Sequence, residues 1–228
     1  MAEAFKHLIN ADAIDAIGAI GAIGPHLARA GLGFERQGFE RQAFEQQALA
    51  GLDTLELKAR VMQVARARVA TLPADVHRAA DILEASLGPA GQGDDLAGLR
   101  TSDAGLAGWA VWPLSEAIAL LAAEQHPARG PQALHAMTQR LTAEFAIRPF
   151  LVRHPALAFA TLSRWADDPG AHVRRLVSKG WVITLAPAEQ RQMRKRHSFK
   201  PVTTRRYPPG AHRIDLRING QVRAVAGF

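Results

Sequence analysis

The sequence predicts a mostly helical protein, an α-α superhelix of stacked helix pairs, followed by a small C-terminal β module. Three observations predict this fold. Apolar residues recur at helical spacing through much of residues 1–180, prolines divide that region into segments of helix length, and short β-branched runs separated by turn residues follow Gly180. We therefore expect two domains, a helical repeat domain at residues 1–180 and a β module at residues 181–228.

The N-terminal region contains short tandem repeats. AIG occurs three times between Ala16 and Gly24, and the pentads GFERQ, GFERQ and AFEQQ run from Gly33 to Gln47. A period of five walks around a helix of 3.6 residues per turn, so the pentads do not build one apolar face. We interpret them as tandem duplications and expect loose local packing there.

Prolines and helical spacing mark the helices that follow. Residues 53–70 place apolar side chains near one stripe, which predicts an amphipathic helix. Proline is tolerated in a first helical turn, because its missing N–H would have no helical partner there. The expected starts of later helices are Pro73, Pro113, Pro131, Pro155 and Asp168-Pro169. A Gly/Asp-rich loop is expected at about residues 88–105.

Four short runs after Gly180 have the composition of strands. They are WVITL (181–185), residues 196–206, HRIDLRI (212–218) and QVRAVAGF (221–228). Asn219-Gly220 separates the last two runs, and Asn-Gly between such runs is the strongest short-range signal for a β-hairpin. A module of this size is small for a core of its own and leaves sheet edges open.

Positive charge is concentrated toward the C-terminus. The net charge is +7, and residues 181–228 hold ten Lys/Arg against only Glu189 and Asp215. Residues 140–179 hold seven Lys/Arg against three acids, and the chain before them is acidic. Such polarised charge favours a polyanionic partner. A solvated basic face is the alternative that charge alone leaves open.

Several classes of site and of location find no signal in the sequence. The chain has no cysteine, which excludes disulfides and thiolate zinc sites, and its nine histidines show no metal-ligand spacing. The most apolar stretch, Ala13 to Ile23, is far shorter than the roughly 20 residues that cross a bilayer. We expect a cytoplasmic protein without a metal, a cofactor or a membrane partner.

Three segments resemble the AlkC-type branch of the AlkC/AlkD-like DNA alkylation repair family. They are LELKARV (55–61), the long block from TAEFAIRPF to LVSKG (142–180), and residues 194–222. WPLSE (112–116) also fits the family. The resemblance implies HEAT-like repeats over residues 1–180 and the end of an immunoglobulin-like domain over residues 181–228. In the family more helical repeats, one with a further carboxylate, and earlier strands follow HVRRL, so the chain resembles a member with its middle removed.

The resemblance implies a DNA glycosylase that hydrolyses the N-glycosidic bond of a cationic alkylated base such as 3-methyladenine. A cationic base is a good leaving group, so carboxylates are needed to stabilise the oxocarbenium-like sugar and to position water. It implies Glu116 and Glu144 as catalytic residues and alkylated double-stranded DNA, in the nucleoid, as the partner. The residues implied in DNA binding are Arg148, Arg153, His154, Arg174, Arg175 and Lys179.

Each candidate also has an ordinary structural interpretation. Glu116, three residues after Pro113, would suit the dipole of a first helical turn. Glu144 would pair with Arg148 at i,i+4 spacing. The basic residues would serve as surface charges and helix caps, and Trp109, Trp112 and Trp165 would more commonly be core residues than stacking platforms.

Two rival hypotheses follow from the missing repeats and from the tandem duplications. The first is a catalytically inactive helical-repeat scaffold that binds DNA without preferring methylated sites. The second is a degraded gene product that folds poorly. Both remain alternatives to the glycosylase hypothesis.

Overall fold

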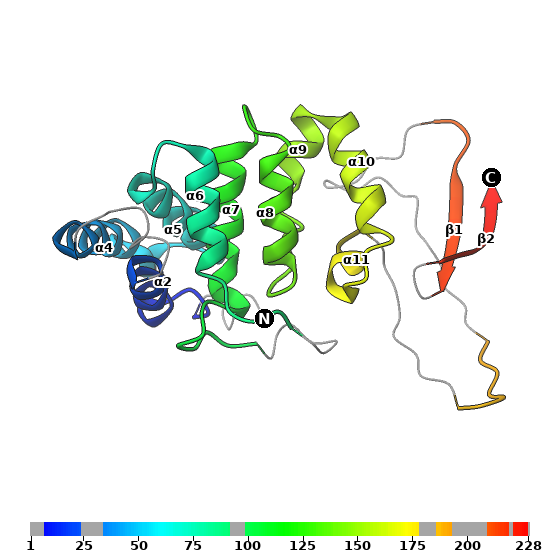
Figure 1. Ribbon diagram of the computed structural model, residues 1–228, viewed down its shortest axis with the longest axis horizontal. Helices are drawn as coiled ribbons and strands as arrows, with labels where there is room; N and C mark the ends of the chain where they lie inside the picture. The colour runs from blue at the N-terminus through cyan, green and yellow to red at the C-terminus, as the bar shows by residue number, and fades with distance from the viewer. Residues whose placement is uncertain are drawn as a thin grey trace. The chain divides into compact units, whose positions relative to one another are not determined.

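The computed structural model describes residues 7–23, 34–91, 99–177, 186–192, 209–218 and 221–227. The chain divides into two compact units, Met1–Ser178 and Lys179–Phe228. The described part of the first unit is helical, and that of the second contains an antiparallel hairpin (Figure 1). The predicted fold class, mostly helical with a small C-terminal β module, is confirmed.

The helices of the first unit follow one another in chain order (Figure 1). They are α2 (Ala11–Ile23), α4 (Phe34–Leu49), α5 (Leu57–Thr71), α6 (Val76–Ala85), α7 (Val111–Ala122), α8 (Arg129–Thr138), α9 (Arg148–Arg153), α10 (Pro155–Trp165) and α11 (Ala171–Val177), with the short 3-10 helices η1 (Leu52–Thr54) and η3 (Gly108–Ala110). Helix α4 packs on α2 and α5, and α7 packs on both α5 and α8. Each helix is therefore covered by helices close to it in the chain.

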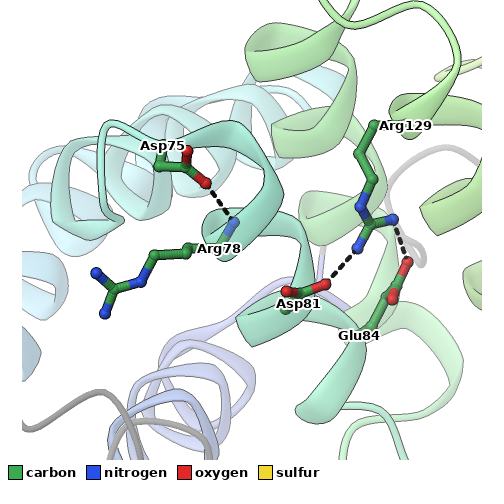
Figure 2. Close-up of polar contacts among 5 residues, drawn as sticks. All are labelled: Asp75, Arg78, Asp81, Glu84 and Arg129. Carbon is green, nitrogen blue, oxygen red and sulfur yellow. Dashed lines mark hydrogen bonds and ion pairs between the residues drawn. The ribbon is translucent and has the colours of Figure 1, made fainter.

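The prolines mark the predicted helices, with shifts of a few residues. Pro155 begins α10, whereas Pro113 and Pro131 are the third residues of α7 and α8. All three lie in a first turn, where the missing N–H costs no helical hydrogen bond. Helix α6 begins three residues after Pro73, because the Asp75 carboxylate caps it by accepting the Arg78 N–H at 2.8 Å (Figure 2).

The tandem repeats of the N-terminal region fold into packed helices. The AIG repeats lie in α2, and the pentads form most of α4. Ile14 and Ile17 of α2 and Phe44 of α4 are at most 1% exposed. A Cβ at Gly18 would lie 3.3 Å from the Phe44 ring, so this glycine permits close approach of the two helices. The expectation of loose packing is therefore wrong for the side chains described here.

An ion-pair cluster joins α8 to α6. Arg129 of α8 donates to Glu84 Oε1 at 2.7 Å and to Asp81 Oδ1 at 2.8 Å (Figure 2). Asp81 and Glu84 are three residues apart, so both carboxylates face the same way from α6. The hydrogen bonds that Arg129 donates to Glu84 and Asp81, and the charges of both acids, raise the pKa of Arg129, whose side chain is only 11% exposed. The cluster fixes the pairing of these two helices.

The second unit contains the predicted hairpin. Strands β1 (Arg213–Ile218) and β2 (Gln221–Gly227) pair antiparallel, with an irregular register between Leu216 and Arg217. Ile214 lies opposite Ala226 and Leu216 opposite Ala224, and all four are exposed. WVITL, residues 196–206 and Asn219-Gly220 lie outside the described residues. Nowhere in the described part of the chain is a helix long and apolar enough to cross a membrane.

Candidate functional site

An apolar cavity of about 250 Å³ lies in the helical unit. Three parts of the chain meet around it: the first turn of α5, the segment comprising η3 and the start of α7, and the connection between α8 and α9. The lining residues are Leu57, Trp109, Trp112, Leu141, Thr142 and Phe145. A largely apolar hollow with aromatic walls is the usual setting of a ligand site.

Three aromatic rings form a continuous wall of this cavity. The centroids of Trp109 and Trp112 are 6.0 Å apart, and those of Trp112 and Phe145 are 5.4 Å apart with only 23° between the ring planes. All three residues are half-buried. Trp109 and Trp112 line the cavity, and Trp112 also packs against the hydrophobic core, whereas Trp165 is a buried core residue at 6% exposure.

Buried residues anchor the connection between α8 and α9 to the core, and this anchoring determines which of its side chains are exposed. Ala143, Ala146 and Ile147 are at most 3% exposed, and the Thr138 hydroxyl accepts the Ala143 N–H at 3.3 Å. Arg140 donates to the carbonyl oxygens of Gly88 and Ala136, both at 2.8 Å. Burial lowers the pKa of Arg140, but an arginine stays protonated in any ordinary buffer.

The same segment exposes the polar and aromatic residues between those anchors. Glu144 and Arg148 are exposed and Phe145 is half-buried. Residues 143, 146 and 147 point into the core, so the side chains between them are directed outward, as in one turn of helix. The conspicuous EFAIR string thereby delivers a carboxylate, a ring and a guanidinium to one place.

Glu116 lies behind the aromatic wall. It is 7% exposed, and its Oε1 accepts the Trp112 Nε1–H at 3.1 Å. Helix α7 begins at Val111, two residues before Pro113, so Glu116 lies in the second turn rather than the first. The helix-dipole interpretation of Glu116 is therefore wrong. Its carboxylate and the Trp112 indole hold each other in place.

Glu144 is not part of an i,i+4 ion pair. It lies in a turn before α9, and among the described residues no ion pair joins it to Arg148. The Arg148 guanidinium instead lies over the Phe145 ring, with its Cζ 4.5 Å from the centroid. Glu116 and Glu144 are thus connected through Trp112 and Phe145, the two rings that stack on each other.

The remaining predicted DNA-binding residues lie elsewhere. Arg153 is 3.7 Å from Glu124, and His154 Nε2 donates to the Ala123 carbonyl oxygen at 3.0 Å. Both contacts are at the C-terminal end of α7, about 18 Å along the helix from Trp112 at 1.5 Å per residue.

The α11 residues behave differently from one another. Arg174 is half-buried and donates to the carbonyl oxygens of Asp168 and Pro169, which close the turn before α11. Its contacts are those of a structural cap. Arg175 is exposed, and Lys179 lies outside the described residues.

Two residues of the site were not predicted from the sequence. Phe145 stands next to Glu144 in the EFAIRPF string, and Lys58 stands in LELKARV. Lys58 Nζ lies 5.4 Å from the Phe145 centroid. Both residues belong to segments that carry the family resemblance, which was the available signal, but their contact joins positions 87 residues apart.

The hydrogen bond between Trp112 and Glu116 should be measurable as a coupling free energy. A hydrogen bond to a charged, buried group contributes about 1.5–3 kcal/mol. We expect Trp112→Phe and Glu116→Ala, alone and combined in a double-mutant cycle, to give a coupling of about this size in the free energy of unfolding, since each substitution removes one partner of the hydrogen bond. Denaturant unfolding checks it. A coupling near zero would mean that the carboxylate and the indole do not hold each other.

Three comparisons with known proteins bear on this site. Residues 169–228 match the family model described as uncharacterised protein YhaZ, C-terminal Ig-like domain. Uncharacterized protein YhaZ of Bacillus subtilis (strain 168) is 45% identical over 49 residues, which are 22% of this chain and 14% of YhaZ. The Pseudomonas fluorescens alkylpurine DNA glycosylase AlkC, solved bound to DNA containing an abasic site analog, superposes with a TM-score of 0.58 at 25% identity.

The structural match covers a larger share of this chain than of AlkC. The superposition on AlkC covers 77% of this chain and 42% of AlkC, so the chain spans less than half of the structure it matches. The match to AlkC fits a helical-repeat solenoid, as the resemblance implied. A family model, a sequence relative and a solved structure thus agree in supporting a resemblance to AlkC/YhaZ-like proteins, the first two over the C-terminal residues and the third over most of the chain.

Proposed function

We propose that this protein acts in DNA alkylation repair as a glycosylase that hydrolyses the N-glycosidic bond of cationic alkylated bases of the 3-methyladenine type. The observation that carries the proposal is the structural similarity to AlkC, a glycosylase solved on DNA with an abasic site analog. The cavity supports it, because aromatic rings line an apolar hollow and Glu144 stands next to one of them, Phe145, in the sequence.

Hydrolysis of a cationic alkylated base requires little from the protein beyond electrostatic stabilisation. A base that already carries positive charge leaves without general-acid help, so the developing oxocarbenium-like sugar is what must be stabilised. Glu144 is exposed beside Phe145 and would stabilise that charge and orient the attacking water. Glu116, the second proposed catalytic carboxylate, is held by Trp112 and adds negative charge behind the ring wall. The proposed reaction needs neither a metal nor a cofactor.

Duplex DNA would be held through its phosphates. Arg148, Arg153 and Arg175 are exposed cations of the helical unit, and exposed cations are what phosphate contacts require. His154 and Arg174 make backbone contacts, so we propose that they shape the turns that carry these cations. Lys179 remains a proposed contact. Residues 1–180 would then be the DNA-holding domain and residues 181–228 a basic appendage.

The proposal is tested by incubating the intact protein with DNA treated with a methylating agent. We expect release of 3-methyladenine above the spontaneous rate, measured by chromatography of the freed bases. Unmethylated DNA is the substrate control, and a thermal unfolding scan of the same sample establishes that the protein is folded. A folded protein that releases no base above background would overturn the glycosylase proposal.

A second candidate function is a catalytically inactive scaffold that binds DNA. It is favoured by the position of Glu116, which is almost fully buried and already hydrogen-bonded to Trp112. A scaffold would bind methylated and unmethylated duplexes with equal affinity, and its binding would weaken steeply with salt. Tighter binding to a duplex that carries an abasic site analog would count against it.

A further inference from the structure

Two positive charges from different helices meet on one aromatic ring. Lys58 Nζ of α5 lies 5.4 Å from the Phe145 centroid, and Arg148 Cζ of α9 lies 4.5 Å from it. Since both distances are measured to the same point, the two charges are no more than about 10 Å apart, which is the screening length at 0.1 M salt. Their fields therefore add in the space between them.

Neither of these two charges makes an ion pair with a carboxylate among the residues that the structure describes. Arg41, Arg129 and Arg213 each make an ion pair with an acid, whereas neither Lys58 nor Arg148 does. Both are exposed, so the pair is accessible from solvent. Two like charges held this close favour an anion between them.

The backbone adds to the same field. Helix α5 begins at the cavity, with Leu57 as its first residue, and has no side-chain hydrogen bond at its N-cap. Free N–H groups at a helix N-terminus carry partial positive charge. The N-terminus of α5 thus contributes partial positive charge at the edge of the apolar cavity, and the exposed carboxylate of its N-cap residue, Glu56, opposes it.

We propose that Lys58 and Arg148 form a two-point clamp for a phosphodiester group at the edge of the aromatic cavity, and that Lys58 is a DNA-phosphate-binding residue. This proposal rests on the proposed function, because the phosphate that the clamp would bind is one of duplex DNA. The two cations on Phe145 disfavour the binding of a cationic base to that ring. The role of the ring is therefore to position the Lys58 ammonium and the Arg148 guanidinium relative to each other. The adjoining nucleotide would then lie against Trp109 and Trp112.

The test compares Lys58→Gln with Arg66→Gln. Arg66 is an exposed cation on the same helix, about 12 Å farther along its axis. Its substitution removes the same charge at a position away from the cavity. The probe is a fluorescent duplex carrying an abasic site analog, titrated by anisotropy between about 50 and 200 mM salt. Loss of one phosphate contact lowers the slope of log K against log salt by about 0.9.

We expect Lys58→Gln to show this loss of slope and a several-fold higher Kd, and Arg66→Gln to keep the wild-type slope. Lys58→Gln combined with Arg148→Gln should lose about twice as much slope, since two contacts are removed. A wild-type slope in Lys58→Gln, or an equal loss in Arg66→Gln, would overturn the clamp. Failure of the wild-type protein to bind the duplex would overturn the clamp and the proposed function together.

The glycosylase assay separates the two proposals. If the protein binds DNA with the expected loss of slope in Lys58→Gln but releases no 3-methyladenine, the clamp stands and the glycosylase proposal fails. If it releases the base and Lys58→Gln keeps the wild-type slope, the reverse holds. Because Lys58 is exposed, its replacement should leave the thermal unfolding midpoint unchanged.

Discussion

Replacement of Glu144 by glutamine should lower the release of 3-methyladenine about 10²–10³-fold, the usual loss when one electrostatic partner of a transition state is removed. Glutamine has the shape of glutamate but no charge, so it cannot stabilise an oxocarbenium-like sugar. Glu144 is exposed and no ion pair joins it to Arg148. The substitution therefore removes one exposed charge next to the cavity residue Phe145 and should change little else in the fold.

The measurement is the single-turnover rate of base release, with DNA affinity determined on the same samples. Glu124→Gln is the matched control, because Glu124 is a 74% exposed carboxylate just beyond the C-terminal end of α7, away from the cavity residues Trp109 and Trp112. Its 3.7 Å pair with Arg153 is a surface contact, which contributes little to stability. Release at the wild-type rate by Glu144→Gln would remove Glu144 from the catalytic residues. Loss of rate together with loss of DNA affinity would assign it to binding instead.

The helices could be predicted from the sequence because their signals are local. Pro155 begins α10, and Pro113 and Pro131 lie in first turns, since the cost of proline depends only on nearby backbone groups. Helix α9 was not predicted. It has six residues and a proline at its second position, too few for an apolar stripe to show helical spacing. The hairpin was predicted from the Asn-Gly dipeptide, again a local signal.

The candidate site could be predicted only in part, because it depends on contacts between distant residues. Glu144 and Arg148 were identified together from one string, but their i,i+4 spacing suggested an ion pair that the turn before α9 does not form. The stacking of Trp112 on Phe145 joins residues on either side of α8, and the contact of Lys58 with Phe145 joins α5 to the connection between α8 and α9. No periodicity in the sequence encodes such pairs.

The buried core under the connection between α8 and α9 holds the exposed site residues in position. Phe150 is 1% exposed, and it belongs to α9, which follows directly from the turn that carries Glu144 and Phe145. Its ring lies against α8 where only a glycine fits: a Cβ at Gly130 would be 2.2 Å from the Phe150 ring. Phe150 is thus the anchor that joins α9 to α8 and supports the exposed residues of the site.

Replacement of Phe150 by alanine should therefore cost about 3–5 kcal/mol of the free energy of unfolding, the usual cost of emptying a buried aromatic site. A loss of this size is a large fraction of the stability of an ordinary domain. Denaturant unfolding followed by circular dichroism measures it, and the wild-type curve itself tests the hypothesis of a poorly folded gene product. A single cooperative wild-type transition would exclude that hypothesis for the helical unit.

Phe159→Ala is the control for Phe150→Ala, because Phe159 is a phenylalanine of the neighbouring helix α10 that is 62% exposed. It should change the free energy of unfolding by no more than about 0.5 kcal/mol, as surface substitutions usually do. Equal losses in the two variants would contradict the packing of α9 on α8. A wild-type transition without cooperativity would instead mean that the α8–α9 connection has no fixed core beneath it, and that Glu144, Phe145 and Arg148 are not held together.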